Sequence, residues 1–183
     1  MGKIKQDFRY KVIKNILNEN EIKIYTDYFK MKHRFNKDSF DLLQSPIYDT
    51  YYYADPLTES LLLNKQNIIE QNSGLELLPT YSFWRMYTHN AKLEKHKDRE
   101  SCEISCTIFV QGDGTKWPIF IEDKSIELEP GDGIIYLGIE DAHWRENFMG
   151  DWHAQFFLHY VDKNGKYKEF HKDKRNLIGG PKL

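Results

Sequence analysis

The chain has 183 residues, 40% of them hydrophobic and 15% aromatic, and a formal net charge of −2. This length and composition predict one globular domain with a sizeable core and argue against disorder. Positive and negative residues are mixed along the chain, so no basic surface indicates nucleic-acid binding.

The cysteines and the N-terminus favour a reducing compartment. Cys102 and Cys106 are the only cysteines. Four residues apart in a strand, their Cα atoms would lie ~13 Å apart, which is too far for a disulfide. The first residues carry no apolar signal-peptide core, and no apolar run approaches the ~18 residues of a membrane span. We therefore expect a cytoplasmic protein that makes no membrane contact.

The first helical signals follow an opening strand. Residues 10–17 read as that strand. Residues 21–31 then carry apolar side chains at helical spacing, after Asn18 and Asn20 as candidate N-caps. We expect a helix over this second segment.

A second helix has clearer boundaries. Asp55 suits the N-cap position, and Pro56 suits the first helical position that follows it. Gly74 then suits the end of the helix, because glycine readily adopts the left-handed conformation found there.

From Leu78 onward, the pattern changes to short strands separated by turns. Turn sequences occupy residues 111–114 and 130–133. Helices followed by closely spaced strands indicate an α+β domain, with the strands forming a double-sheet jelly roll and the N-terminal helices buttressing one face. The predicted strands cover residues 81–87, 102–110, 117–121, 133–137, 143–146 and 154–161.

We expect a single domain over residues 1–183. Residues 1–80 form a mixed helical and strand support region, and residues 81–165 form the jelly-roll catalytic core. Residues 166–183 read as a charged tail, whose interleaved basic and acidic residues favour a solvated terminus over a binding arm.

Three residues form a candidate metal site. His96 and Asp98 lie two positions apart, so their side chains point to the same side at a strand end. His143 lies 47 residues later, at the start of a predicted strand. Two imidazoles and one carboxylate on one face of an iron(II) ion leave positions open for O₂ and an organic cosubstrate. A structural zinc site would instead close with a fourth ligand.

The sequence around the first His-x-Asp pair supports its interpretation as a metal site. The chain repeats the pattern at His171-Lys172-Asp173, within the charged tail and without a following strand or distal histidine. We interpret this second copy as a surface feature.

Several segments of the core match a known family. From about residue 81 to residue 165, the chain resembles the iron(II)- and 2-oxoglutarate-dependent oxygenases of the prolyl-4-hydroxylase-like type. The matching segments are Arg85-Met86-Tyr87, His96-Lys97-Asp98, residues 128–132, residues 142–146 and residues 150–160. The first 80 residues carry no motif of this kind.

The resemblance implies a distorted double-stranded β-helix with Fe(II) at its mouth, held by His96, Asp98 and His143. In such enzymes, 2-oxoglutarate chelates the iron, and a basic residue on the strand after the distal histidine binds its far carboxylate. With O₂, the cosubstrate yields succinate and CO₂ while a substrate C–H bond is hydroxylated.

The cosubstrate residues depart from this pattern. The usual basic position is occupied by His153, a weaker and pH-dependent partner for a carboxylate. Arg145 lies two positions after His143 and shares its face, and its planar guanidinium suits a carboxylate. We expect Arg145 and His153 to bind the cosubstrate jointly, with Tyr87 as the hydroxyl donor. Arg85 and Arg99 are further candidates.

Each of these residues also has a structural interpretation. Tyr87 could be a half-buried strand aromatic, and Arg145 could pair with Glu140 or Asp141 at the surface. Glu103 could face solvent or hydrogen-bond a ligand histidine. The remaining structural interpretations are His153 and His159 as hydrogen-bonded core histidines, Trp144 and Trp152 as packing residues, and Asp132 as a turn residue.

The predicted function is a 2-oxoglutarate-dependent dioxygenase acting on a small-molecule or peptide substrate. A cupin-like metalloenzyme that does not use 2-oxoglutarate is one alternative. A non-catalytic jelly-roll binding module is another. The loops that set the substrate lie at residues 116–118 and 78–84 in our interpretation, and nothing in the sequence specifies the substrate or the oligomeric state.

Overall fold

The computed structural model describes residues 9–36 and 49–180. The two α-helices are α1 (Glu19–Asn36) and α2 (Pro56–Ser73), and neither is long and apolar enough to cross a membrane. The strands are β1 (Tyr10–Ile13), β2 (Thr50–Tyr53), β3 (Leu77–Thr88), β4 (Leu93–His96), β5 (Ile104–Gly112), β6 (Ile119–Ile121), β7 (Lys124–Ile126), β8 (Gly133–Leu137), β9 (His143–Arg145) and β10 (Trp152–Asp162). Two short 3-10 helices, η1 (Glu100–Cys102) and η2 (Lys168–Lys174), complete these elements.

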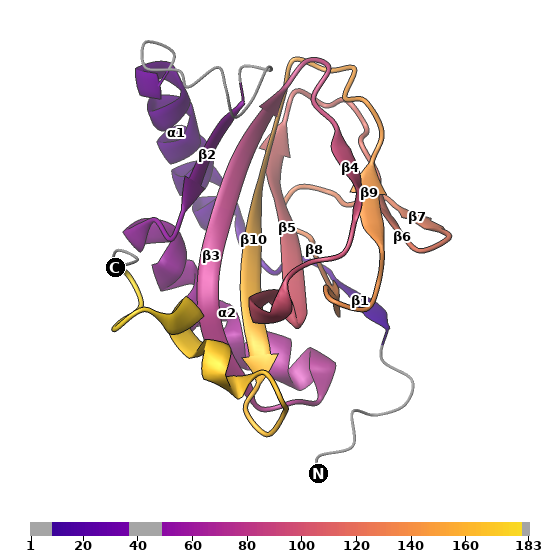
Figure 1. Ribbon diagram of the computed structural model, residues 1–183. Helices are drawn as coiled ribbons and strands as arrows, with labels where there is room; N and C mark the ends of the chain where they lie inside the picture. Colours follow the sequence, from indigo (N-terminus) through magenta and orange to yellow (C-terminus); the bar gives the residue numbers. More distant parts are fainter. Residues whose placement is uncertain (1–8, 37–48, 181–183) are drawn as a thin grey trace.

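The strands form two antiparallel sheets that face each other (Figure 1). The larger sheet has the order β1-β8-β5-β10-β3-β2, and the smaller has the order β4-β9-β6-β7. Both helices cover the outer face of the larger sheet. The predicted α+β architecture, a double-stranded β-helix with N-terminal buttressing helices, is confirmed.

Alternation along β10 separates the core from the space between the sheets. Residues 154, 156, 158 and 160 belong to the hydrophobic core shared with the helices. Since side chains alternate along a strand, residues 153, 155, 157 and 159 face the smaller sheet. These inward positions carry histidine, glutamine and phenylalanine side chains, which is the polar content expected of a site.

The helix ends follow the predicted capping residues. The Oδ1 atom of Asp55 accepts the backbone N–H of Leu57 at 3.1 Å, and Gly74 adopts φ 72° at the end of α2. At the start of α1, Asn18 and Glu21 form a capping box in which each side chain accepts the other's backbone N–H. Asn18, rather than Asn20, therefore caps α1.

An aromatic cluster fastens α1 to the larger sheet. Phe29 of α1 is fully buried and stacks on Trp84 of β3, with ring centroids 4.2 Å apart. Its ring also meets Phe156 of β10 edge-on at 4.9 Å. Such contacts add stability beyond the apolar area that they bury.

Three strands were not predicted, and one was predicted too long. β2, β4 and β7 have only three or four residues each, and the sequence of β4, Leu-Glu-Lys-His, lacks an apolar face. Pairing with β9, rather than local pattern, makes β4 a strand. The opening strand ends at Ile13 instead of residue 17, because Asn15 turns the chain with φ 52°.

The expectation of a solvated charged tail is wrong. Arg175 is buried and forms an ion pair with the buried Glu59 of α2 at 2.5 Å. Asp173, from the second His-x-Asp copy, is also buried and accepts hydrogen bonds from both terminal nitrogens of the Arg99 guanidinium. The carboxylate of Glu59 needs a buried cation, and the tail supplies it.

Replacing Arg175 with alanine should lower the free energy of unfolding by about 3–5 kcal/mol, because the Glu59 carboxylate would stay buried without its partner. Lys163→Ala, which breaks the exposed pair with Glu76, should cost less than about 1 kcal/mol. Urea unfolding of both variants measures the difference. Equal losses would contradict a docked tail.

Candidate metal centre and adjoining cavity

The three predicted ligands converge. His96 of β4 and His143 of β9 are direct partners in the antiparallel register of the smaller sheet. Asp98 follows two residues after His96, and its Oδ1 atom lies 3.6 Å from the Nε2 atom of each histidine. Ligands at ~2.1 Å from one ion lie between ~3 Å and ~4.2 Å apart, so this spacing suits a single ion.

Backbone carbonyls orient both imidazoles. The Nδ1 atom of His96 lies 2.7 Å from the carbonyl oxygen of Glu94, and that of His143 lies 3.0 Å from the carbonyl oxygen of Asp141. A proton on each Nδ1 leaves the Nε2 lone pair directed at the space beside Asp98. This is the tautomer that a metal ligand needs.

Asp98 is held as an anion. Burial raises its pKa, but the imidazoles of His143 and His96 outweigh burial and hold the pKa well below its ordinary range. The hydroxyl of Ser105 donates to Oδ2 at 2.9 Å, and the backbone N–H of Asp98 donates to the carbonyl of Gly138 at 2.8 Å. A Cβ atom at residue 138 would lie 2.5 Å from the carboxylate, so this close approach requires glycine.

A second group of ligand-type atoms lies behind Asp98. Cys102 and His159 each come within 4.8 Å of an Asp98 oxygen. Burial raises the pKa of the Cys102 thiol to about 12 and lowers the pKa of His159 to about 4. Both side chains are neutral and bonded elsewhere, Cys102 to the hydroxyl of Tyr81 and His159 to that of Ser105. The triad therefore has no evident fourth ligand among the described residues.

A cavity of about 190 Å³ lies between the sheets. Phe109 and His153 line it from the larger sheet, and Arg145 lines it from the smaller. Lys116 and Glu127 form an ion pair at 2.6 Å among the lining residues. Arg145 follows two residues after His143 on β9, so one strand supplies a residue to the triad and a residue to the cavity lining.

Arg145 is a buried cation without a carboxylate partner in the described part of the chain. It is 1% exposed, and its guanidinium donates to the carbonyl of Trp117 and to the side-chain oxygen of Gln155. Its Nε–H has no partner among the described residues. Burial lowers the pKa of Arg145 to about 10, which still leaves it charged at neutral pH. An uncompensated buried cation is costly, and this one favours an anion in the cavity.

His153 lies beside Arg145 but is not a second cation. Its ring stacks on Phe109 with centroids 4.2 Å apart, and neither ring nitrogen has a partner among the residues described. Burial lowers its pKa well below the ordinary range, and the Arg145 charge lowers it further. His153 therefore offers one neutral N–H donor, whereas Arg145 carries the charge in this cavity.

Gln155 links the predicted cosubstrate residues and was missed in the sequence. Its amide accepts from Arg145 at 2.9 Å and donates to the hydroxyl of Tyr87 at 3.4 Å. Tyr87 is buried behind this amide and is not a lining residue of the cavity. The inward alternation of His153 and Gln155 along one strand was the available signal.

The other predicted residues have structural roles. Arg85 pairs with Asp49 at 2.6 Å, and Arg99 pairs with Asp173, so neither reaches the cavity. Glu103 accepts the backbone N–H of Asp162 rather than a ligand histidine. Asp132 accepts the side chain of Lys14 and two backbone N–H groups, as its turn role predicted.

The likeness to known proteins is one of fold. No family model matches the sequence, and no curated protein matches it. The viral collagen prolyl hydroxylase of Paramecium Bursaria Chlorella virus-1, solved as a 2-oxoglutarate complex, is 11% identical with a TM-score of 0.65, over 87% of this chain and 98% of that one. The Pseudomonas putida prolyl-4-hydroxylase is 16% identical with a TM-score of 0.61, over 84% and 92%.

HygX from Streptomyces hygroscopicus extends this comparison beyond prolyl hydroxylases. Its structure, with nickel and 2-oxoglutarate bound, is 9% identical with a TM-score of 0.64, over 85% of this chain and 83% of that chain. The protein thus has the double-stranded β-helix fold found in 2-oxoglutarate-dependent oxygenases.

The buried, neutral His153 predicts a specific loss of stability in acid. The unfolded chain protonates this histidine near pH 6.5, whereas the folded state resists protonation until well below that value. Below about pH 6.5 the unfolded state therefore binds more protons than the folded state. The stability that neutral His153 gives the folded state is complete above about pH 6.5 and is lost as pH falls, at up to ~1.4 kcal/mol per pH unit. His153→Gln should flatten the slope of unfolding free energy between pH 6.5 and 4.5. An unchanged slope in His153→Gln would contradict a buried, neutral His153.

Proposed function

We propose that the protein is a non-haem iron(II), 2-oxoglutarate-dependent dioxygenase that hydroxylates a C–H bond of its substrate. The observation that carries this proposal is the pairing of a His-Asp-His triad with a cavity that holds an uncompensated arginine. The triad suits the metal, and the cavity suits a carboxylate. Strand β9 supplies His143 to the triad and Arg145 to the cavity. The fold supports the same reaction class.

His96, Asp98 and His143 would hold the iron. Two imidazoles and one carboxylate are the ligand set of iron(II) oxygenases, and they occupy one face of the ion. The side chain of His96 is 39% exposed whereas that of His143 is 3% exposed, so the centre lies at the mouth of the β-helix. When bound, the iron and 2-oxoglutarate supply the oxidation, with succinate and CO₂ as coproducts.

Arg145 and His153 would bind the far carboxylate of the cosubstrate. The Nε–H of Arg145 and one N–H of His153 are the unmet donors of the cavity. On β9, Arg145 and His143 point to the same face of the strand, and their Cα atoms lie ~6.6 Å apart. Gln155 fixes the guanidinium and connects it to Tyr87. Phe109 and Trp117 keep water from this charge, which strengthens its attraction for an anion.

Replacing His96 with alanine should abolish stoichiometric binding of Fe(II), because a ligand is lost. His171→Ala is a matched control, since it alters the second His-x-Asp copy and leaves the triad intact. Anaerobic titration with Fe(II) and 2-oxoglutarate, followed by the visible charge-transfer band of the chelate, measures both variants. If wild type and His96→Ala held equal metal, the protein would be a non-catalytic jelly-roll module instead.

Arg145→Gln should raise the Kd for 2-oxoglutarate between about 30- and 150-fold. The change removes charge-assisted hydrogen bonds worth about 2–3 kcal/mol. Metal affinity should be retained, because Arg145 does not reach the triad. Equal 2-oxoglutarate affinity in both proteins, or turnover without succinate release, would favour a cupin-like enzyme that does not use this cosubstrate.

A further inference from the structure

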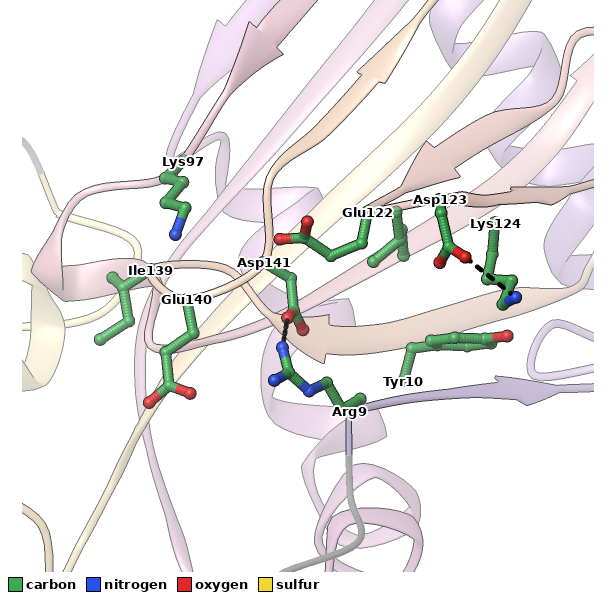
Figure 2. A pocket seen from close by; sticks show the side chains of 10 residues that line it. Arg9, Tyr10, Lys97, Glu122, Asp123, Lys124, Ile139, Glu140 and Asp141 are labelled. Atoms are coloured by element: carbon green, nitrogen blue, oxygen red, sulfur yellow. Dashed lines mark hydrogen bonds and ion pairs between the residues drawn. The ribbon is translucent and has the colours of Figure 1, made fainter.

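A second, larger cleft of about 800 Å³ opens at the metal end of the β-helix (Figure 2). Its walls come from the start of β1, the turn between β6 and β7, and the loop between β8 and β9. Lys97 also lines it and lies between the proposed ligands His96 and Asp98. The same β8–β9 loop receives the backbone hydrogen bond of Asp98 at Gly138. Close sequence neighbours of the proposed ligands, Lys97 and Asp141, therefore line this cleft.

Asp141 is the unusual group in this cleft. Its side chain is fully buried, yet it lines the cleft and points toward Arg9 (Figure 2). Its Oδ1 atom accepts one hydrogen bond, from Arg9 at 2.8 Å. Its Oδ2 atom has no partner among the described residues. A buried carboxylate oxygen without a donor is costly, so Asp141 has binding capacity that the described chain leaves unused.

The present partner of Asp141 is replaceable. The side chain of Arg9 is 68% exposed, and it uses one terminal nitrogen where a guanidinium can offer two to a carboxylate. The other charges of the cleft do not neutralise Asp141. Lys124 pairs with Asp123 at 3.1 Å, and Lys97 lies on the opposite wall (Figure 2). Glu122 and Glu140 add negative charge to the cleft.

We propose that this cleft is the substrate site and that Asp141 binds a guanidinium group of the substrate, in the position that Arg9 now occupies. The role of this ligand as a substrate rests on the proposed oxygenase function. Asp141 precedes His143 by two residues, so their Cα atoms lie at most ~7 Å apart. A ligand anchored at Asp141 by its guanidinium would thus be held two residues along the chain from the proposed ligand His143. The substrate class is an arginine-like molecule or an arginine side chain of a peptide.

Calorimetric titration with L-argininamide and its uncharged counterpart L-citrullinamide tests this assignment without turnover. Arg9→Ala should bind L-argininamide at least about fivefold more tightly than wild type, because the internal competitor is gone. Adding Asp141→Asn should weaken that binding about 10- to 150-fold, the range expected when hydrogen bonds to a charged group are lost. Glu169→Gln, which removes an exposed carboxylate that does not line the cleft, should change it less than threefold.

The competing outcomes are distinct. No binding by Arg9→Ala, equal binding of the two amides, or an unchanged affinity in the Asp141→Asn double variant would overturn the proposal. The comparison of the two amides on the Arg9→Ala protein holds even if the Asp141 variant fails to fold. Stimulation of succinate formation by L-argininamide would support its role as a substrate. Succinate formation without any response to L-argininamide would overturn the cleft assignment alone, whereas L-argininamide binding without succinate formation would overturn the proposed function.

Discussion

The antiparallel pairing of β4 with β9 is the constraint on which the site depends. It sets His96 directly opposite His143, although 47 residues separate them in the chain. A register shift of one residue would turn one imidazole to the opposite face of the sheet. The pairing is supported at the β8–β9 loop, where Gly138 lets the backbone and carboxylate of Asp98 approach closely.

Two buried charges of opposite sign lie on either side of this pairing. Arg145 is buried without a carboxylate among the described residues, and Asp141 is buried with one oxygen unmet. Glu59 and Arg175, by contrast, are buried as a close ion pair. A buried charge whose polar atoms are only partly satisfied lowers stability, so two such groups close to the triad in sequence favour a role in binding. Arg145 would attract an anion, and Asp141 would attract a cation.

Local sequence signals predicted the parts of the fold that local interactions determine. The boundaries of α2 follow from Asp55, Pro56 and Gly74, whose conformational preferences need no tertiary partner. The triad was accessible because its spacing and its flanking strands could be read together. β4 was not, since its four residues become a strand only through pairing with β9. The docked tail was missed for a related reason: its charges read as solvated until Glu59 and Arg99 are placed beside them in space.

The cosubstrate residues show the same division. Arg145 was identified because it shares the face of His143, but the protonation of His153 depends on its burial between Phe109 and Trp117. Gln155 and Asp141 carry no sequence motif, and only the folded chain shows what each contacts. The sequence therefore predicted that His96, Asp98 and His143 converge, but it did not predict the contacts of the residues that surround them.

Anomalous diffraction from crystals grown with Mn(II) and 2-oxoglutarate would test the proposed His-Asp-His centre. We expect one ion at ~2.0–2.2 Å from Nε2 of His96, Nε2 of His143 and a carboxylate oxygen of Asp98, with the cosubstrate on the open side and its far carboxylate at Arg145. An ion bound elsewhere, or a site closed by Cys102 or His159 as a fourth protein ligand, would contradict it.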